Sequence, residues 1–159
     1  MTDPSKFGYK GMSYNRLRFK SRSLDANVAV FAWYLAHNLP ATPINPSSSS
    51  ITVRSQSYTT VASPSALQSP SEYSLSVITP PKVTKKLLQE AREAGIKAVW
   101  LQPGTFDDEI IQYVRKEWPD THLAGFNDPP GTEAHDGWCV LVEGEKGMRI
   151  ANRSEGGRL

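Results

Sequence analysis

The sequence predicts an α/β protein with a Rossmann-like, three-layer α/β/α arrangement around a mostly parallel sheet. Two short apolar runs rich in β-branched residues, at residues 75–78 and 96–101, have the character of buried strands. Between them, residues 82–94 carry apolar side chains at helical spacing. A strand, a helix and a second strand in this order form a βαβ unit, in which the two strands are parallel.

The boundaries of this central unit have clear chemical causes. Thr79, Pro80 and Pro81 end the first strand and open the helix, because a proline at a helix start lacks only an N–H group that would be unpaired anyway. Gly95 is typical of the residue that ends a helix in the left-handed conformation. After the second strand, Thr105 is expected to cap a further helix over residues 105–117, whose first turn is acidic.

The flanking segments predict further elements. A helix is expected over residues 30–38 and a strand over 42–45, followed by a Ser- and Pro-rich loop over 47–72. Within this loop a weak edge strand is expected at 51–53 and one helical turn at 65–67. Toward the end of the chain, the pattern predicts a polar, turn-rich stretch, two strands and a flexible tail. The polar stretch covers residues 120–137, the two strands 138–142 and 148–150, and the tail 152–159.

Composition limits the class of protein. The 159 residues suit a single domain, and the net charge of +2 is too small to favour nucleic acid as a partner. The single cysteine, Cys139, excludes an internal disulfide and a multi-cysteine zinc site, and its apolar context predicts a buried, unreactive thiol. No apolar run is long enough to span a membrane. The expected location is the cytoplasm, with the mitochondrion as a weaker alternative.

A parallel sheet of this kind binds ligands beyond the carboxyl ends of its strands. This rule selects three loops of the predicted fold, which together give the candidate ligand-binding residues. They are Asn45 and Pro46; Thr79, Pro80 and Pro81; and Gln102, Pro103 and Gly104.

Several motifs resemble one known family. Residues 74–110, and above all the WLQPG motif at 100–104, resemble the small stand-alone CoA-binding domains related to the succinyl-CoA synthetase α subunit, and fungal members most closely. The motifs ATPINP at 41–46 and DPSKFGYK at 3–10 add to the likeness. The resemblance implies membership of the NAD(P)-binding-like superfamily and non-covalent binding of coenzyme A or acyl-CoA at the same three loops. Lys6 and Lys10, together with Lys82 and Arg54, are candidates to neutralise the phosphates or the 3′-phosphate of CoA, and the alternative for each is a solvated surface charge.

The beginning of the chain departs from the family pattern. In the family a strand and a Gly-rich turn precede the DPSKFGYK motif, and here the chain begins with Met1 and Thr2, so this strand and turn are expected to be missing. Residues 11–29 read as an insertion, which we interpret as translated from a retained intron. A basic surface loop and a transit-peptide-like arm are the alternatives. Ser47 stands where family members frequently carry a basic residue.

The candidate residues also have structural interpretations. Thr79 either caps its helix or binds a ligand, and Asn45 either holds its own turn or contacts adenine or ribose. No catalytic triad, metal cluster, Walker loop or GxGxxG motif is found, so we expect a binding module and not an enzyme. The alternatives are an NAD(P)-binding protein of oxidoreductase type and a truncated interaction domain without a ligand. Protein partners stay open.

Overall fold

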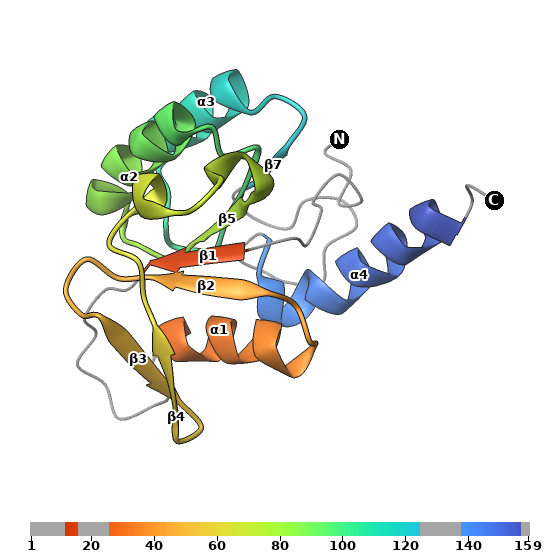
Figure 1. Ribbon diagram of the computed structural model, residues 1–159. Helices are drawn as coiled ribbons and strands as arrows, with labels where there is room; N and C mark the ends of the chain where they lie inside the picture. The colour runs from red at the N-terminus through yellow and green to blue at the C-terminus, as the bar shows by residue number, and fades with distance from the viewer. Residues whose placement is uncertain (1–11, 16–25, 125–137, 157–159) are drawn as a thin grey trace.

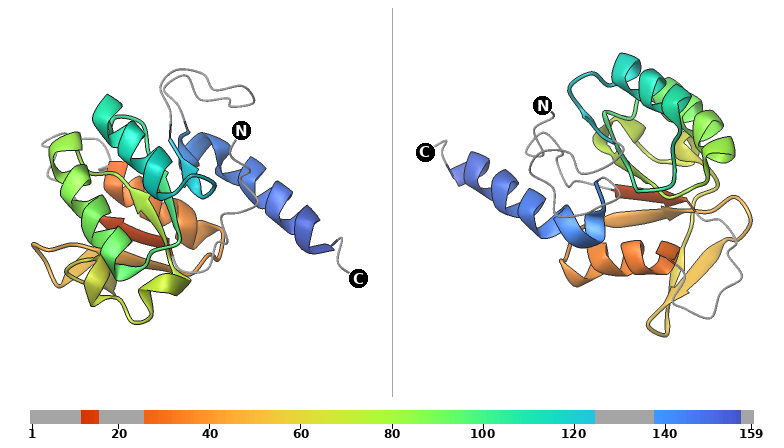
Figure 2. Two further views of the ribbon diagram at one scale, coloured as in Figure 1. Left: turned by 90° about the horizontal axis from the view of Figure 1, so that it is seen from above. Right: turned by 180° about the vertical axis from the view of Figure 1, so that it is seen from behind.

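The computed structural model describes the backbone of residues 12–15, 26–124 and 138–156 and the side chains of 28–124 and 138–149. Within these residues, one five-stranded sheet lies between two layers of helices (Figure 1). Views from above and from behind show the same layers (Figure 2). The predicted three-layer α/β fold is confirmed.

All neighbouring strands of the main sheet are parallel. In spatial order the strands are β2 (Ala41–Ile44), β1 (Met12–Asn15), β5 (Ser74–Val77), β6 (Ala98–Leu101) and β7 (His122–Leu123). Counted along the chain within this sheet, the order is second, first, third, fourth, fifth. It is a doubly wound order, and its topological switch point lies between β1 and β5.

Helices cover both faces of the sheet (Figure 1). The helices are α1 (Ala26–Ala36), α2 (Pro81–Ala94), α3 (Asp108–Glu117) and α4 (Val140–Gly156). On one face, α2 and α3 bury Leu87, Leu88, Ile110 and Val114 against the apolar side chains of β5 and β6. This burial of one stripe of each helix is the main source of stability for a layered domain.

The other face is covered by α1, the first half of α4 and a β-hairpin. Phe31 and Tyr34 of α1 pack with Trp100 of β6 and Val140 of α4, and all of these side chains are buried. The hairpin adds an edge-to-face contact between Phe31 and Tyr58, whose ring centroids lie 5.2 Å apart.

The sheet does not lack its central strand. Residues Met12–Asn15 form β1 and pair with β2 on one side and with β5 on the other. The expectation of a missing first strand is therefore wrong, and part of the segment 11–29 supplies it. The physical reason is that β2 and β5 would otherwise each present a row of unpaired backbone groups to one another. Whether residues 11–29 are an insertion relative to the family stays a prediction. Residues 16–25, which follow β1 in the sequence, contain no glycine and so no Gly-rich turn of the family type.

The last strands predicted from the sequence are also wrong. Residues 140–150 belong to α4, which replaces the strands expected at 138–142 and 148–150, and residues 152–156 continue this helix in place of a tail. The buried positions Val140, Glu143, Gly144 and Gly147 recur at helical spacing. Three consecutive aliphatic residues shortly before a glycine also fit a strand and a turn, whereas the packing of Gly144 on Trp33 favours a helix.

The Ser- and Pro-rich segment 47–72 contains more structure than predicted. It holds an antiparallel hairpin, β3 (Ser50–Val53) with β4 (Gln56–Thr59), of which only the first strand was expected. Its turn residues Arg54 and Ser55 have φ angles of 48° and 68°. Two short 3-10 helices follow, Pro64–Ala66 and Pro70–Glu72.

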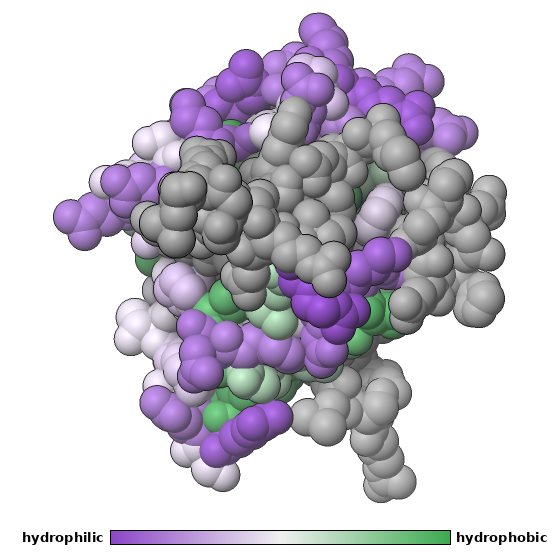
Figure 3. Space-filling model, turned by 90° about the vertical axis from the view of Figure 1, so that its right-hand side faces the viewer, coloured by the Kyte–Doolittle hydropathy of each residue, from purple (hydrophilic) through white to green (hydrophobic). Residues whose placement is uncertain are grey.

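Helix α4 projects from the body of the molecule (Figure 1). Seen from the side toward which α4 points, the surface is a mixture of polar and small apolar areas (Figure 3). Among the helices of the described residues, none is both long and apolar enough to cross a membrane.

Candidate functional site

The fold brings the three predicted loops to one edge of the sheet. Residues 45–46, 79–81 and 102–104 directly follow β2, β5 and β6, which are parallel members of the same sheet. Their carboxyl ends therefore lie on the same side, at the left of Figure 1. The loops after β2 and β5 lie on either side of β1, next to the switch point.

Asn45 is the buried polar residue at the end of β2. Its side chain Oδ1 accepts a hydrogen bond from the backbone N–H of Ser47 at 2.9 Å, and its own N–H donates to the carbonyl of Val61 at 2.8 Å. The residue is only 3% exposed, and its Nδ2 has no hydrogen-bond partner in the described part of the chain. Because Oδ1 is fixed by Ser47, the side chain holds a buried donor that lacks an acceptor.

The loop after β5 is organised by two threonines. The hydroxyl of Thr84 donates to the carbonyl of Thr79 at 2.8 Å, and the two hydroxyl oxygens lie 2.6 Å apart. Since a hydroxyl has one hydrogen, Thr84 must accept the hydrogen of the Thr79 hydroxyl. Thr79 therefore does not cap α2 through its side chain. Pro80 occupies that position and makes no side-chain hydrogen bond.

The amino terminus of α2 is consequently open to an anion. Its first turn has no acidic residue, and Lys82 is exposed there. Backbone N–H groups and the helix dipole both favour negative charge at such a position. Helix α3 differs: Asp107 caps it by accepting from the N–H of Ile110 at 2.9 Å, and acidic residues fill its first turn.

The loop after β6 is held by its own side chains. Gln102 is buried: its Oε1 accepts from the N–H of Val140 at 2.8 Å, and its Nε2 donates to Ser76 Oγ at 3.3 Å. Thr105, predicted as the cap of α3, instead donates its hydroxyl to the carbonyl of Gln102 at 2.7 Å. Helix α3 begins later because Phe106 enters the core before it. Gly104 adopts a φ of 82° with open space around it.

The other predicted residues lie elsewhere. Lys6 and Lys10 fall outside the described residues. Arg54 lines a cavity of about 190 Å³ between α1 and the hairpin. Cys139 is half-buried and precedes α4, so the expectation of a buried thiol in a strand is wrong. In the described residues, no three His, Cys, Asp or Glu side chains are grouped so that they could hold a metal ion.

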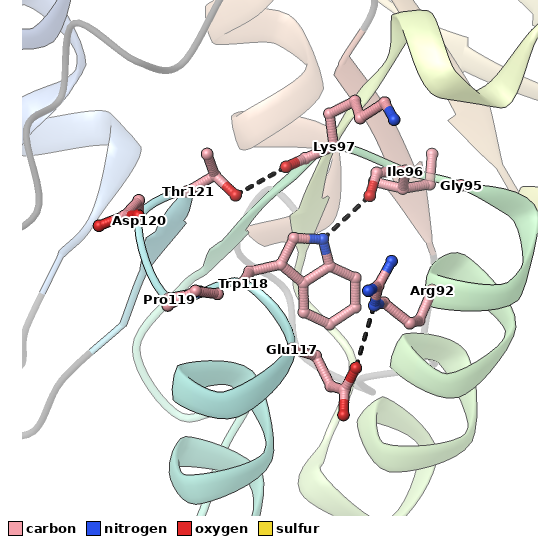
Figure 4. A pocket seen from close by; sticks show the side chains of 9 residues that line it. All are labelled: Arg92, Gly95, Ile96, Lys97, Glu117, Trp118, Pro119, Asp120 and Thr121. Carbon is pink, nitrogen blue, oxygen red and sulfur yellow. Dashed lines mark hydrogen bonds and ion pairs between the residues drawn. The ribbon is translucent and has the colours of Figure 1, made fainter.

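A second cavity, of about 220 Å³, lies at the opposite edge of the sheet (Figure 4). It is formed where α2 and α3 end and where β6 and β7 begin. Arg92 donates from Nε to Glu117 Oε2 at 3.0 Å, and its guanidinium lies 6.0 Å from the centre of the Trp118 ring. The hydrogen bond from Arg92 lowers the pKa of Glu117 below its ordinary value of 4.5. The Arg92–Glu117 pair therefore joins the ends of α2 and α3 in the wall of this cavity.

The sheet and its loops define a class: a doubly wound α/β protein whose carboxyl edge holds the unpaired amide of Asn45 and the uncapped amino terminus of α2. Comparison with known proteins gives the family. Residues 21–144 match the family model described as a CoA binding domain. The match covers more than half of the chain, and the protein therefore belongs to this family. The fungal affinity stays a prediction.

Solved structures of similar fold come from archaea and bacteria. A conserved hypothetical protein from Pyrococcus furiosus has 22% identity and a TM-score of 0.57, with 71% of this chain and 90% of that chain covered. A hypothetical protein from Pyrococcus horikoshii OT3 has 18% identity and a TM-score of 0.60, covering 92% and 84%. A Thermus thermophilus protein has 22% identity and a TM-score of 0.54, covering 77% and 90%. These similarities support the fold. No curated protein matches the sequence.

Proposed function

We propose that this chain binds coenzyme A or an acyl-CoA non-covalently at the carboxyl edge of its sheet, as a module that catalyses no reaction. Membership of the CoA binding domain family supports the ligand class. The position of the three loops beside the switch point supports the place, because doubly wound sheets bind nucleotides there.

The observation that carries the proposal is the unpaired amide of Asn45. A buried donor without an acceptor costs about 1–3 kcal/mol, which a ligand acceptor at this position would recover. On the other side of β1, the loop after β5 leads into α2, whose uncapped amino terminus with Lys82 provides a place for phosphate. A neutral acceptor near Asn45 and an anion near α2 fit the two ends of an adenosine diphosphate group.

The proposed ligand-contacting residues act in different ways. Asn45 contributes its amide nitrogen, and Pro46, Pro80, Pro81, Pro103 and Gly104 shape the backbone of the three loops. Thr79 and Gln102 are positioning residues, because their side chains already hydrogen-bond within the protein. Lys6 and Lys10 stay proposed phosphate contacts.

A binding experiment tests the proposal. The chain is titrated with CoA, acetyl-CoA and NADH by calorimetry, and thermal unfolding is followed at rising ligand concentration, since a ligand specific for the folded state raises the melting temperature. We expect saturable binding of CoA and acetyl-CoA and none of NADH. Binding of NADH alone would favour a dinucleotide-binding oxidoreductase, and no binding at all would favour an interaction domain.

The variant Asn45→Ser links binding to the site. Serine keeps an oxygen that can accept from the Ser47 N–H and removes the amide donor. We expect the affinity for CoA to fall about ten-fold, equivalent to about 1.4 kcal/mol, with little change in melting temperature without ligand. The exposed Gln112 on α3 gives the control Gln112→Ala, which should bind normally. Unchanged affinity in Asn45→Ser would remove Asn45 from the site.

A further inference from the structure

A cavity of about 190 Å³ lies between helix α1 and the hairpin, and none of the three candidate loops lines it. The last turn of α1 contributes Leu35 and Ala36, and the hairpin contributes Val53, Gln56 and Tyr58. The walls are therefore largely apolar, with an amide and a phenol group beside them. Because pockets for drug-sized ligands measure roughly 300–1,000 Å³, this cavity suits a smaller molecule.

Among the described residues, Arg54 is the one charged group that lines this cavity. Arg54 and Ser55 form the turn of the hairpin, since Val53 pairs with Gln56. Their φ angles of 48° and 68° are both positive, a combination that hairpin turns usually assign to asparagine and glycine. An arginine in this conformation is strained. The strained turn places a guanidinium group in the wall of an otherwise neutral cavity.

The elements around Arg54 contain no acidic residue that could balance its charge. Between Asp25 and Glu72 the sequence has no Asp or Glu, and this stretch supplies all of α1, β2, β3 and β4. In the part of the chain that the structure describes, Arg54 forms no ion pair. A guanidinium group binds a carboxylate through two parallel N–H···O bonds, and it is less strongly hydrated than an ammonium group.

From this cavity we infer a second binding site, which takes a small monocarboxylate with a short alkyl chain. The carboxylate pairs with the Arg54 guanidinium, and the Gln56 amide and the Tyr58 hydroxyl are neutral donors in the same wall. The alkyl chain lies against the apolar side chains of α1 and β3. Inorganic phosphate can meet the arginine but has no apolar part for these walls, so a carboxylate with a chain is the better ligand. The site is separate from the carboxyl edge of the sheet and does not depend on the proposed function.

The expected affinity is modest. Arg54 is exposed, and an ion pair in contact with water contributes little to binding. Each methylene group that leaves water strengthens binding by up to about four-fold. Because the cavity is open to solvent at Arg54 and the chain is only partly buried, we expect butyrate to bind in the millimolar range and acetate about five-fold more weakly.

The test follows the Arg54 Nε–H and the Leu35 methyl groups by NMR spectroscopy. The full chain is titrated with sodium butyrate, sodium acetate or sodium phosphate at constant ionic strength, so that screening is the same throughout. We expect saturable shifts of both signals with the two carboxylates and no saturable shift of Leu35 with phosphate. Butylammonium, which has the same chain and the opposite charge, should move neither signal. Equal affinities for butyrate and phosphate, or no saturable shift with butyrate, would overturn the inference.

Variants separate the contributions of charge and cavity. Arg54→Gln should weaken butyrate binding by about five-fold or more, and Arg54→Lys should weaken it less, because lysine keeps the charge and loses the paired bonds. The exposed Arg115 on α3 gives the control Arg115→Gln, which should bind butyrate normally.

A cavity-filling variant tests the same site without changing its charge. Ala36→Leu adds bulk from the end of α1, and it should weaken butyrate more than acetate, so that the preference for the longer chain is lost. Thermal unfolding without ligand shows that each variant is folded. Unchanged butyrate affinity in Arg54→Gln, or an unchanged preference for butyrate in Ala36→Leu, would contradict binding in this cavity.

Discussion

Replacing Gln102 by leucine should loosen α4 without removing a ligand contact. In the structure the amide of Gln102 joins the first residue of α4, through the Val140 N–H at 2.8 Å, to the hydroxyl of Ser76 on β5 at 3.3 Å. Leucine has a similar volume and no polar atoms, so it leaves the Val140 N–H and the Ser76 hydroxyl buried without these partners.

The magnitude follows from those two groups. An unpaired buried donor or acceptor costs about 1–3 kcal/mol. Because the bond to Ser76 is long and therefore weak, we expect a total loss of about 2–4 kcal/mol in the free energy of unfolding. Ser76→Ala alone should cost less, about 1 kcal/mol, and the double variant should cost less than the sum, since the two residues share one hydrogen bond.

The assay is urea unfolding of the three variants, combined with hydrogen exchange of the Val140 amide. Gln102→Leu should speed the exchange of this amide more than that of amides in α2. A loss below about 0.5 kcal/mol, the range of surface substitutions, or unchanged protection of Val140, would refute the role of Gln102 as the link between the sheet and α4.

Three further outcomes are expected. Gly144→Ala should destabilise the fold by about 1–3 kcal/mol, because the added Cβ would lie 2.3 Å from the Trp33 ring. This clash outweighs the higher helix propensity of alanine. Chemical unfolding measures the loss, and a stabilised variant would contradict the packing of Gly144 on Trp33. Ser55→Gly should raise stability by about 0.5–1 kcal/mol, since its φ of 68° suits glycine; a lower melting temperature would argue against that turn. Because the pKa of Glu117 is lowered by Arg92, its contribution is present above pH 4.5 and is lost as pH falls below that value. An acid titration of Arg92→Gln should show this part of the pH dependence removed, and an unchanged profile would be evidence against the pair.

Local patterns were sufficient for the centre of the chain. The β-branched runs, the apolar spacing of α2 and the left-handed Gly95 follow from interactions within a few residues, and the structure confirms them. The rule for parallel sheets places the three loops at one edge from the sequence alone.

Function-related details depended on distant partners. The residues of β1 have no strong hydrophobic pattern of their own. They form a strand because their backbone pairs with β2 on one side and with β5 on the other. Helix α4 takes the place of the expected strands because Gly144 allows close contact with Trp33.

The sequence by itself therefore determined the βαβ unit and the sheet edge at which the three candidate loops lie, because short-range spacing encodes both. Only the tertiary structure decided which side chains at that edge stay available. Gln102 is engaged by a backbone group 38 positions away, whereas the amide of Asn45 is buried without an acceptor. Hydrogen-bond saturation depends on groups brought together by folding, and no local pattern in the sequence contains that information.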